Sequence, residues 1–397
     1  MKETERTVKI YPIYHAFTAD LVFFIPIDTL FLSYVKGLSA SQITFMNMFG
    51  LIICILFRKV VIKIAKEINN LNSVRLGMIL LFISTMILTF SKTFYGLLLY
   101  SLISNLSAML TSMLRVLIKH DLSAINKTEE FVKTINLGNI TYGIVTLFTT
   151  IVAGYLYNYN NYLPLYITLV IIASTFLLTF AFVDKNNDEE NKEVKQNKFN
   201  KSSKLVLILL SSSLFVSIFR IGQNNSKLFL QYDLQNILSL NKVTLYITYI
   251  VFVSRIVRIL SNLFFTKLYH KYKLQIGNYM AILHFICYGL LIIGHCINNF
   301  YLKILLMSLG YFVILGIRDP FQTYIEDITL KNTPDEYQQQ IVIELETYRK
   351  IGQLIINLTF TLILLEHELV ITEIVLMLLA FIEIIINYKM TRTLEQQ

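Results

Sequence analysis

The sequence predicts an all-α polytopic membrane protein with twelve transmembrane helices in two parallel six-helix halves. Three observations predict this fold class. The 397 residues are 55% hydrophobic and only 15% charged, with a mean hydropathy of +0.59. The apolar residues form long runs, each long enough to cross about 30 Å of hydrocarbon as a helix. The sequence also resembles itself at a spacing of about 200 residues.

The apolar runs predict the individual spans. We expect them near residues 12–35, 43–60, 74–91, 95–118, 134–157, 163–183, 205–226, 243–265, 276–297, 302–324, 339–365 and 369–389. Six precede the polar stretch 184–204 and six follow it. Pro26 and Pro320 fall inside predicted spans, where a missing backbone donor kinks a helix.

The internal repeat appears as short echoes that occur in the same order in both copies. The segment Leu-Phe-Leu-Ser-Tyr at 30–34 returns as Leu-Phe-Leu-Gln-Tyr at 228–232. Arg58 returns as Arg258, and Thr-Tyr at 141–142 returns at 347–348. These echoes map span 1 onto span 7, and six spans per copy is an even number. Both copies therefore enter the membrane from the same side.

The repeat and the polar stretch define the expected domains. Residues 1–183 form an N-terminal half, residues 184–204 a charged cytoplasmic linker, and residues 205–397 a C-terminal half. The linker mixes acids with lysines and has no apolar periodicity, so we expect a mobile tether. A short amphipathic helix on the membrane surface is the alternative.

The net charge of +9 reports topology and not nucleic-acid binding. Most of the 35 Lys and Arg residues lie at the termini, in the loops that join even to odd spans, and in the linker. Positive residues accumulate on the cytoplasmic side, so both termini are expected there. The exceptions are Lys36, Lys92, Lys227, Lys242, Lys303 and Arg220. Abundant Lys, Asn and Ile with no Trp hint at an AT-rich bacterial genome, and hence at a bacterial inner membrane.

Two parallel six-helix halves joined by a charged linker resemble the major facilitator superfamily of transporters. The family's loop between spans 2 and 3 carries a Gly-x-x-x-Asp-Arg-x-Gly-Arg-Arg type of run, and residues 64–77 match its frame. Lys66 stands where the family has Asp, Asn69 where it has Gly, and Asn70 where it has Arg. The turn at 37–43 also looks like a common family pattern. The resemblance implies a midplane substrate cavity that opens alternately to each side.

Asp20 and Asp28 in the first span are candidates for proton coupling. In a helix, eight residues separate them by about 80° and roughly 12 Å, so they share a broad face. A carboxylate in a low-dielectric cavity holds its proton more tightly than in water, which lets it load and release one. A structural hydrogen bond to a neighbouring helix is the alternative for either residue.

Span 7, the counterpart of span 1, carries base and amide groups. Arg220 stays charged at any relevant pH, so it requires a partner. Asp28, Asp20 or an anionic part of the substrate is expected to supply it. The same span contributes Gln223, Asn224 and Asn225 as candidate cavity residues.

Three further residues complete the predicted cavity. Arg255 lies near the middle of span 8 and has no basic counterpart in the first copy, where position 55 is Ile. Arg58 and Arg258 are interpreted instead as interface charges at cytoplasmic ends. Neutral hydrogen-bonding groups in spans 4 and 5 are expected to join helices or line the cavity, and the favoured candidates are Asn105 and Asn139.

Charges near the inner ends of spans 10 and 11 predict a cytoplasmic gate. Glu346 can pair with residues three and four positions on, since these share a helix face. Lys66 is expected to meet Glu344 or Glu346 with the family's polarity reversed. The gate set is Lys66, Arg318, Asp319, Glu344, Glu346 and Arg349. Snorkelling of charged helix ends into the interface is the alternative.

These patterns predict a proton-coupled secondary transporter that exports a small molecule. Uptake of a nutrient by the same fold, and a non-transporting receptor or scaffold, remain open. No phosphate-binding loop, HExxH or GxSxG motif supports ATP drive or an enzyme. His284, Cys287 and the other cysteines are interpreted as packing residues, and Glu383 as packing or lipid-facing. We expect a monomer in the lipid bilayer, with no metal or cofactor.

Overall fold

A computed structural model describes residues 2–25, 27–28, 31–38, 40–183, 202–235, 240–366 and 369–396. Throughout these residues the regular secondary structure is helical. The chain divides into two compact units. Unit 1 comprises Met1–Asn200 and Thr329–Thr347, and unit 2 comprises Lys201–Ile328 and Tyr348–Gln397. Most of the predicted linker, residues 184–201, lies outside the described residues.

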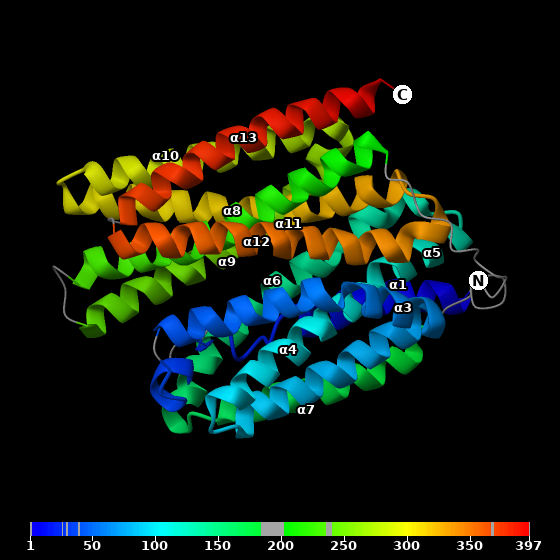
Figure 1. Cartoon of the computed structure of the whole chain (residues 1–397), viewed down its shortest axis with the longest axis horizontal. Coiled ribbons are helices and arrows are strands. Elements are labelled where there is room, and N and C mark those ends of the chain that lie inside the picture. Colours follow the sequence, from blue (N-terminus) through cyan, green and yellow to red (C-terminus); the bar gives the residue numbers. More distant parts are fainter. Residues whose placement is uncertain are drawn as a thin grey trace. The chain divides into compact units, whose positions relative to one another are not determined.

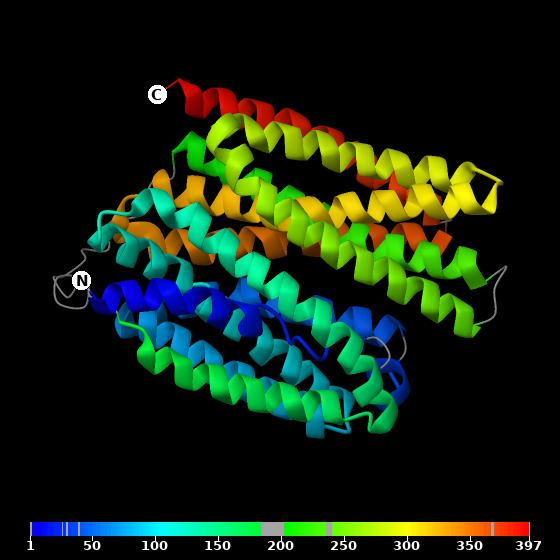
Figure 2. The ribbon, with the colours of Figure 1, turned by 180° about the vertical axis from the view of Figure 1, so that it is seen from behind.

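The helices of unit 1 pack mainly through α3 against α4 and through α1 against α6 (Figures 1 and 2). Their bounds are α1 Lys2–Thr18, α3 Ala40–Phe90, α4 Phe94–Thr111, α5 Leu114–Ala124, α6 Phe131–Tyr159 and α7 Leu163–Leu178. Gly50 of α3 sits so close to Ser101 and Asn105 of α4 that a Cβ there would meet Asn105 Nδ2 at 2.3 Å. A residue without a side chain is therefore what lets these two helices meet.

The helices of unit 2 gather around α13, which packs against both α10 and α8. Their bounds are α8 Ser203–Gln235, α9 Leu240–Tyr272, α10 Ile276–Cys296, α11 Phe300–Lys331, α12 Gln338–Glu366 and α13 Leu369–Glu395. α11 runs through Pro320. The residue four positions earlier is Gly316, and the carbonyl of that turn is the one a proline ring crowds.

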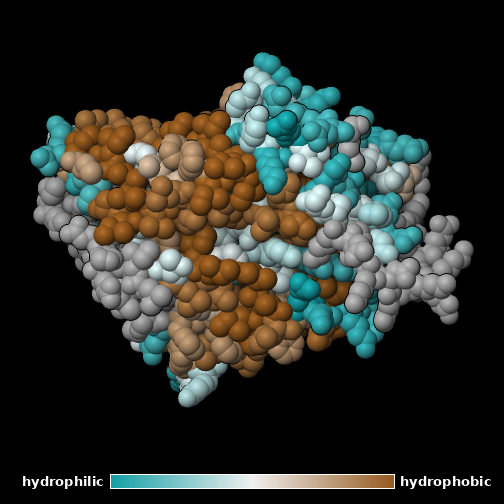
Figure 3. Space-filling view, turned by 45° about the horizontal axis from the view of Figure 1, so that its top comes forward, coloured by the Kyte–Doolittle hydropathy of each residue, from teal (hydrophilic) through white to brown (hydrophobic). Residues whose placement is uncertain are grey.

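Apolar side chains cover much of the outer surface. Figure 3 shows a broad hydrophobic area on one face, with hydrophilic side chains gathered beside it. On α10 and α13 the exposed residues include Leu283, Ile286, Leu378, Ile382 and Ile385. Among the described residues, seven segments are long and apolar enough to cross a membrane: Phe94–Ala124, Thr128–Tyr157, Leu163–Ala181, Ser203–Gln223, Tyr249–Cys296, Phe300–Lys331 and Val370–Glu395.

The first predicted span, 12–35, is wrong as a continuous helix. α1 starts ten residues earlier and ends at Thr18, whose hydroxyl donates to the Tyr14 carbonyl at 2.8 Å. Turns follow at 22–25, and a short π-helix occupies Phe31–Val35. The sequence offers a reason, because a proline at 26 removes a backbone donor and restricts the residue before it. Pro26 itself lies outside the described residues.

The interruption also changes the meaning of the repeated Leu-Phe-Leu-x-Tyr segment. Its second copy, at 228–232, lies within α8, whereas the described part of its first copy belongs to the π-helix. Leu30 lies outside the described residues. The two copies therefore share a sequence but not a backbone conformation.

Apolar packing and one lysine hold the chain after the interruption in place. Phe24, Ile27 and Phe31 belong to a buried cluster that also includes residues of α3, α4 and α7. Lys36 Nζ donates to the carbonyls of Thr89 at 2.9 Å and Ser91 at 2.7 Å. Partial burial lowers the pKa of Lys36.

The matched loop between predicted spans 2 and 3 is a sharp kink within α3. Asn69 has φ 63° and ψ 174°, a conformation that essentially only glycine adopts without strain. The transporter family has Gly at this position of the frame, so the backbone requirement persists although the residue has changed. The side chain compensates in part, because Asn69 Oδ1 accepts from the Asn72 amide at 2.9 Å. Asn69 thereby caps the second half of α3.

Replacing Asn69 with glycine should stabilise the protein by about 1 kcal/mol, because relief of backbone strain outweighs the lost cap. Asn69→Ala should destabilise it, since alanine keeps the strain and loses the cap. Thermal unfolding of detergent-purified protein measures both. Asn160→Gly is the control, because Asn160 has an ordinary extended φ of −153°. A lower midpoint for Asn69→Gly than for wild type would contradict the strain.

Candidate functional site

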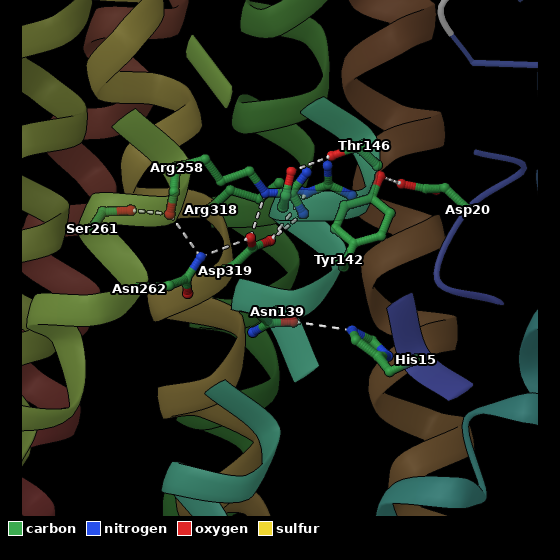
Figure 4. A network of polar contacts seen from close by, with 11 residues as sticks. His15, Asp20, Asn139, Tyr142, Thr146, Arg258, Ser261, Asn262, Arg318 and Asp319 are labelled. Carbon is green, nitrogen blue, oxygen red and sulfur yellow. Dashed lines mark hydrogen bonds and ion pairs between the residues drawn. The ribbon is translucent and has the colours of Figure 1, made fainter. Parts of the chain in front are cut away.

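In unit 1, polar side chains of the interrupted first segment face α6 (Figure 4). The Tyr142 hydroxyl donates to Asp20 Oδ2 at 2.5 Å. One turn along α6, Asn139 Oδ1 lies 3.1 Å from His15 Nε2. The His15 ring stacks on Tyr11 with centroids 5.4 Å apart. The structure therefore brings together two predicted residues, Asp20 and Asn139, with two partners that sequence reasoning did not select.

Asp28 lies apart from that network, in a different setting. It is half-buried and close enough to Tyr100 of α4 to interact with it electrostatically, and Ser104 lies near the same tyrosine. The predicted 80° separation of Asp20 and Asp28 does not apply, because the chain between them is not a continuous helix. Non-helical backbone at membrane depth is tolerated only inside protein or beside a water-filled cavity.

Asn105 is held at a helix crossing. Its Nδ2 donates to the Ser101 carbonyl at 2.8 Å, and it packs directly on Gly50. Ser101 in turn donates to the Met46 carbonyl at 2.8 Å. These contacts correspond to the helix-joining alternative for Asn105.

In unit 2, a buried ion pair joins α9 to α11. Arg258 binds Asp319 through two nitrogens, with Nη2 2.7 Å from Oδ1 and Nε on Oδ2, and Asn262 Nδ2 lies 3.2 Å from Asp319 (Figure 4). Both charged side chains are 4% exposed. The interpretation of Arg258 as an interface charge was therefore wrong, and Asp319 has a structural partner. Breaking such a pair from one side costs about 3–5 kcal/mol.

The other predicted bases of unit 2 lie on α8, α9 and α11. Arg318 packs its guanidinium over the Phe219 ring at 5.4 Å and lies 3.8 Å from Asp319. Arg220 of α8 is exposed, and Arg255 of α9 is 8% exposed. Tyr311 lies close to both Gln223 and Arg255. The side chains of Asn224 and Asn225 lie outside the described residues.

Within unit 1, the segment Thr329–Thr347 contacts the N-terminal helices at three points. Arg115 Nη1 of α5 lies 3.7 Å from Glu346 Oε1, and Lys119 Nζ donates to the Leu330 carbonyl at 2.6 Å. Gln339 Nε2 donates to Asn70 Oδ1 beside the α3 kink at 3.1 Å. The expected partner of Glu346 was Lys66, but Lys66 is exposed and forms no ion pair with any described residue. Arg115 takes that place.

The remaining predicted gate residues occupy two other settings. Glu344 accepts from Gln340 one turn earlier on α12 at 3.1 Å. Arg349 lies 3.5 Å from Glu326 and donates from Nε to the Ser212 hydroxyl at 2.7 Å, inside unit 2.

A buried cluster of ionisable groups in unit 2 was interpreted as packing in the sequence. His284 Nδ1 of α10 lies 2.8 Å from Glu383 Oε2 of α13, with both side chains fully buried. The Tyr288 hydroxyl lies 3.3 Å from His284 Nε2. Glu373 is 2% exposed, and neither of its carboxylate oxygens has a hydrogen-bond partner in the described structure. The sequence signal for this cluster was the presence of two acids, Glu373 and Glu383, in the apolar predicted span 369–389.

The described residues contain no group of three or more His, Cys, Asp or Glu side chains placed to hold a metal ion. Their polar groups are instead arranged in pairs and short chains between neighbouring helices. Such arrangements can exchange a proton or present a charge to a ligand.

No protein-family model and no curated protein matches this sequence. Solved structures do resemble it. A bacterial homologue of the iron transporter ferroportin, in an outward-facing state, matches with TM-score 0.72 and 12% identity over 99% of this chain and 100% of that one. The human organic anion transporter MFSD10 matches with TM-score 0.71 and 12% identity over 97% and 99% of the two chains. The nucleoside transporter NupG matches with TM-score 0.61 and 11% identity over 98% of each.

This chain therefore has the same fold as these solved transporters, as the sequence resemblance implied. The chain is a multi-pass membrane protein.

Exchanging the charges of Arg115 and Glu346 should restore stability that either single change removes. Arg115→Glu and Glu346→Arg each place like charges together, whereas the double variant rebuilds the pair. A double-mutant cycle on thermal unfolding should give a coupling of about 0.5–1 kcal/mol, since both side chains are partly exposed. Lys66→Glu with Glu344→Lys is the matched control and should be additive. Additive losses at Arg115 and Glu346 would show that the pair contributes nothing.

Proposed function

We propose that this protein is a secondary active transporter that exports a small molecule by alternating access, with proton coupling. We place it in a bacterial cytoplasmic membrane with both termini inside. The proposal includes twelve spans in two parallel halves, acting as a monomer. The transporters with the same fold act on unlike cargo, named as iron, organic anions and nucleosides, so the fold leaves the substrate open.

The observation that carries the proposal is the interruption of the first helix at Asp20. Transporters build binding sites from discontinuous helices, because freed backbone groups and nearby side chains can then face a cavity. Here the helix ends at Thr18, and Asp20 follows in irregular backbone with its carboxylate on Tyr142 of α6. An ionisable acid at membrane depth costs free energy, so Asp20 is a candidate for a functional role.

The bond between Asp20 and Tyr142 suggests how a proton would be coupled to movement. The ionised carboxylate accepts the tyrosine hydroxyl proton in a charge-assisted bond. Once Asp20 binds a proton, that bond weakens to one between neutral groups. Protonation would therefore loosen the first segment from α6, while release of the proton would tighten it again.

The contacts of segment Thr329–Thr347 support a gate that can open. Arg115 with Glu346, Lys119 with the Leu330 carbonyl, and Asn70 with Gln339 are contacts in each of which at least one residue is partly exposed. Each contributes little on its own, so a modest free-energy change can break all three. We propose that they hold the cytoplasmic side closed.

A vesicle transport assay also tests two alternative functions. A nutrient permease would move its substrate inward down the proton gradient, reversing the expected direction. A receptor or scaffold would bind without moving anything, and the altered charges at Lys66, Asn69 and Asn70 in the loop frame are its best support. An enzyme is disfavoured, since the structural neighbours are transporters and not enzymes.

Asp20→Asn should abolish gradient-driven transport, because the amide cannot carry the proton. Everted membrane vesicles containing the protein are energised with an inward-acidic pH gradient, and uptake of ethidium and of fluorescein is followed. A fall of at least about tenfold is expected, and Glu336→Gln, at an exposed acid, should leave uptake unchanged.

Gradient-driven uptake that persists in Asp20→Asn would remove Asp20 from coupling, and the same result for Asp28→Asn would remove Asp28. Movement of the dye out of everted vesicles would favour the permease. No movement of any compound that stabilises the purified protein would favour a receptor.

A further inference from the structure

Arg255 is a buried cation with no carboxylate partner among the residues that the structure describes. It lies in the interior of α9 and is 8% exposed, and its Nε is shielded from solvent with no hydrogen-bond acceptor. Within the described part of the chain, no carboxylate pairs with it. An uncompensated charge taken out of water is strongly destabilising. Such a residue is therefore expected to have a ligand that the protein does not itself provide.

Two other arginines of unit 2 each have a carboxylate partner. Arg258, one turn further along α9, has both oxygens of Asp319. Arg349 of α12 has Glu326 and the Ser212 hydroxyl. These acids are already engaged. Among the described residues, Arg255 therefore has no carboxylate partner, whereas Arg258 and Arg349 each have one.

The groups around Arg255 suit an oxyanion. Tyr311 of α11 lies close enough to Arg255 of α9 and to Gln223 of α8 to interact with both. A phenol and a carboxamide can both donate to an anionic oxygen. Three different helices therefore bring neutral donors and one permanent cation to the same place.

Arg220 adds a second cation at matching depth. It lies 15 residues before Gln235, where α8 ends, and Arg255 lies 15 residues after Leu240, where α9 begins. α8 and α9 pack against each other, so both arginines lie roughly 22 Å along their helices from the connection. Arg220 is exposed and pairs with no described carboxylate, and it precedes Gln223 by three residues on one helix face.

We propose that Arg255, Gln223 and Tyr311, with Arg220 at the entrance, form the binding site for a carboxylate group on the transported molecule. The substrate class is then an organic monocarboxylate. This inference rests on the proposed transport function, but binding can be measured without transport. A guanidinium and a carboxylate form a charge-assisted, bidentate pair, which gives orientation as well as affinity.

The first test needs no ligand and compares the same substitution at adjacent turns of one helix. Arg255→Met removes a charge that has no partner, so the thermal midpoint of purified protein should equal or exceed that of wild type. Arg258→Met strands Asp319 and should lower the midpoint. A midpoint for Arg255→Met below wild type would mean that Arg255 has a protein partner, and the proposal would be overturned.

The second test measures binding through thermal stabilisation by benzoate, by its uncharged analogue benzamide and by inorganic phosphate. Benzoate should raise the midpoint of wild type saturably, whereas benzamide should not. The shift should be lost in Arg255→Met and kept in Arg392→Met, which alters an exposed arginine of α13. An equal benzoate shift in Arg255→Met, or no shift with wild type, overturns the proposal.

Further outcomes distinguish a bound carboxylate from a bound phosphate or lipid headgroup. They also distinguish failure of the binding site from failure of the transport function. If only phosphate or added phosphatidylglycerol stabilises wild type through Arg255, a phosphate or lipid headgroup occupies the site and the substrate assignment fails. If benzoate binds through Arg255 but no compound is transported by vesicles, the site stands and the transport function fails. If a compound is transported but no benzoate shift depends on Arg255, the transport function stands and the Arg255 site fails.

Discussion

Polar side chains at membrane depth must find partners inside the protein, because hydrocarbon offers none. The bond between Asp20 and Tyr142 in unit 1 and the pair between Arg258 and Asp319 in unit 2 are the two clearest answers to that constraint. Each joins helices that are distant in sequence. Such contacts favour particular helix neighbours, because apolar surfaces alone are less selective.

The two units meet the same constraint in different ways. In unit 1, an acid and a histidine are bonded to neutral groups, a phenol and an amide. Such bonds change strength when a proton arrives. In unit 2, arginines that cannot titrate are bonded to acids, while Arg255 lacks one. The proposed proton-coupled movement of an anion rests on these two kinds of group.

Much of the fold could be predicted from the sequence, because long apolar runs report helices directly. A loop between spans 2 and 3 was also predicted, and the α3 kink at Asn69, with φ 63°, lies within it. The first span was mispredicted because its hydropathy continues through residues 19–30 while the helix stops at Thr18. Hydropathy measures the preference of side chains for an apolar surrounding, and it does not detect a break in backbone hydrogen bonding.

Partners were harder to predict than positions. Asp20, Asn139, Arg255, Asp319 and Glu346 could be recognised as costly polar groups from their location alone. That Glu346 meets Arg115 and not Lys66, or that His284 meets Glu383, depends on how helices cross and rotate. The sequence by itself therefore determined the class of protein, most of its helices and the residues that need a partner, because burial in hydrocarbon follows from composition. Only the tertiary structure decided which partner each one has, because that choice depends on contacts between side chains far apart along the chain.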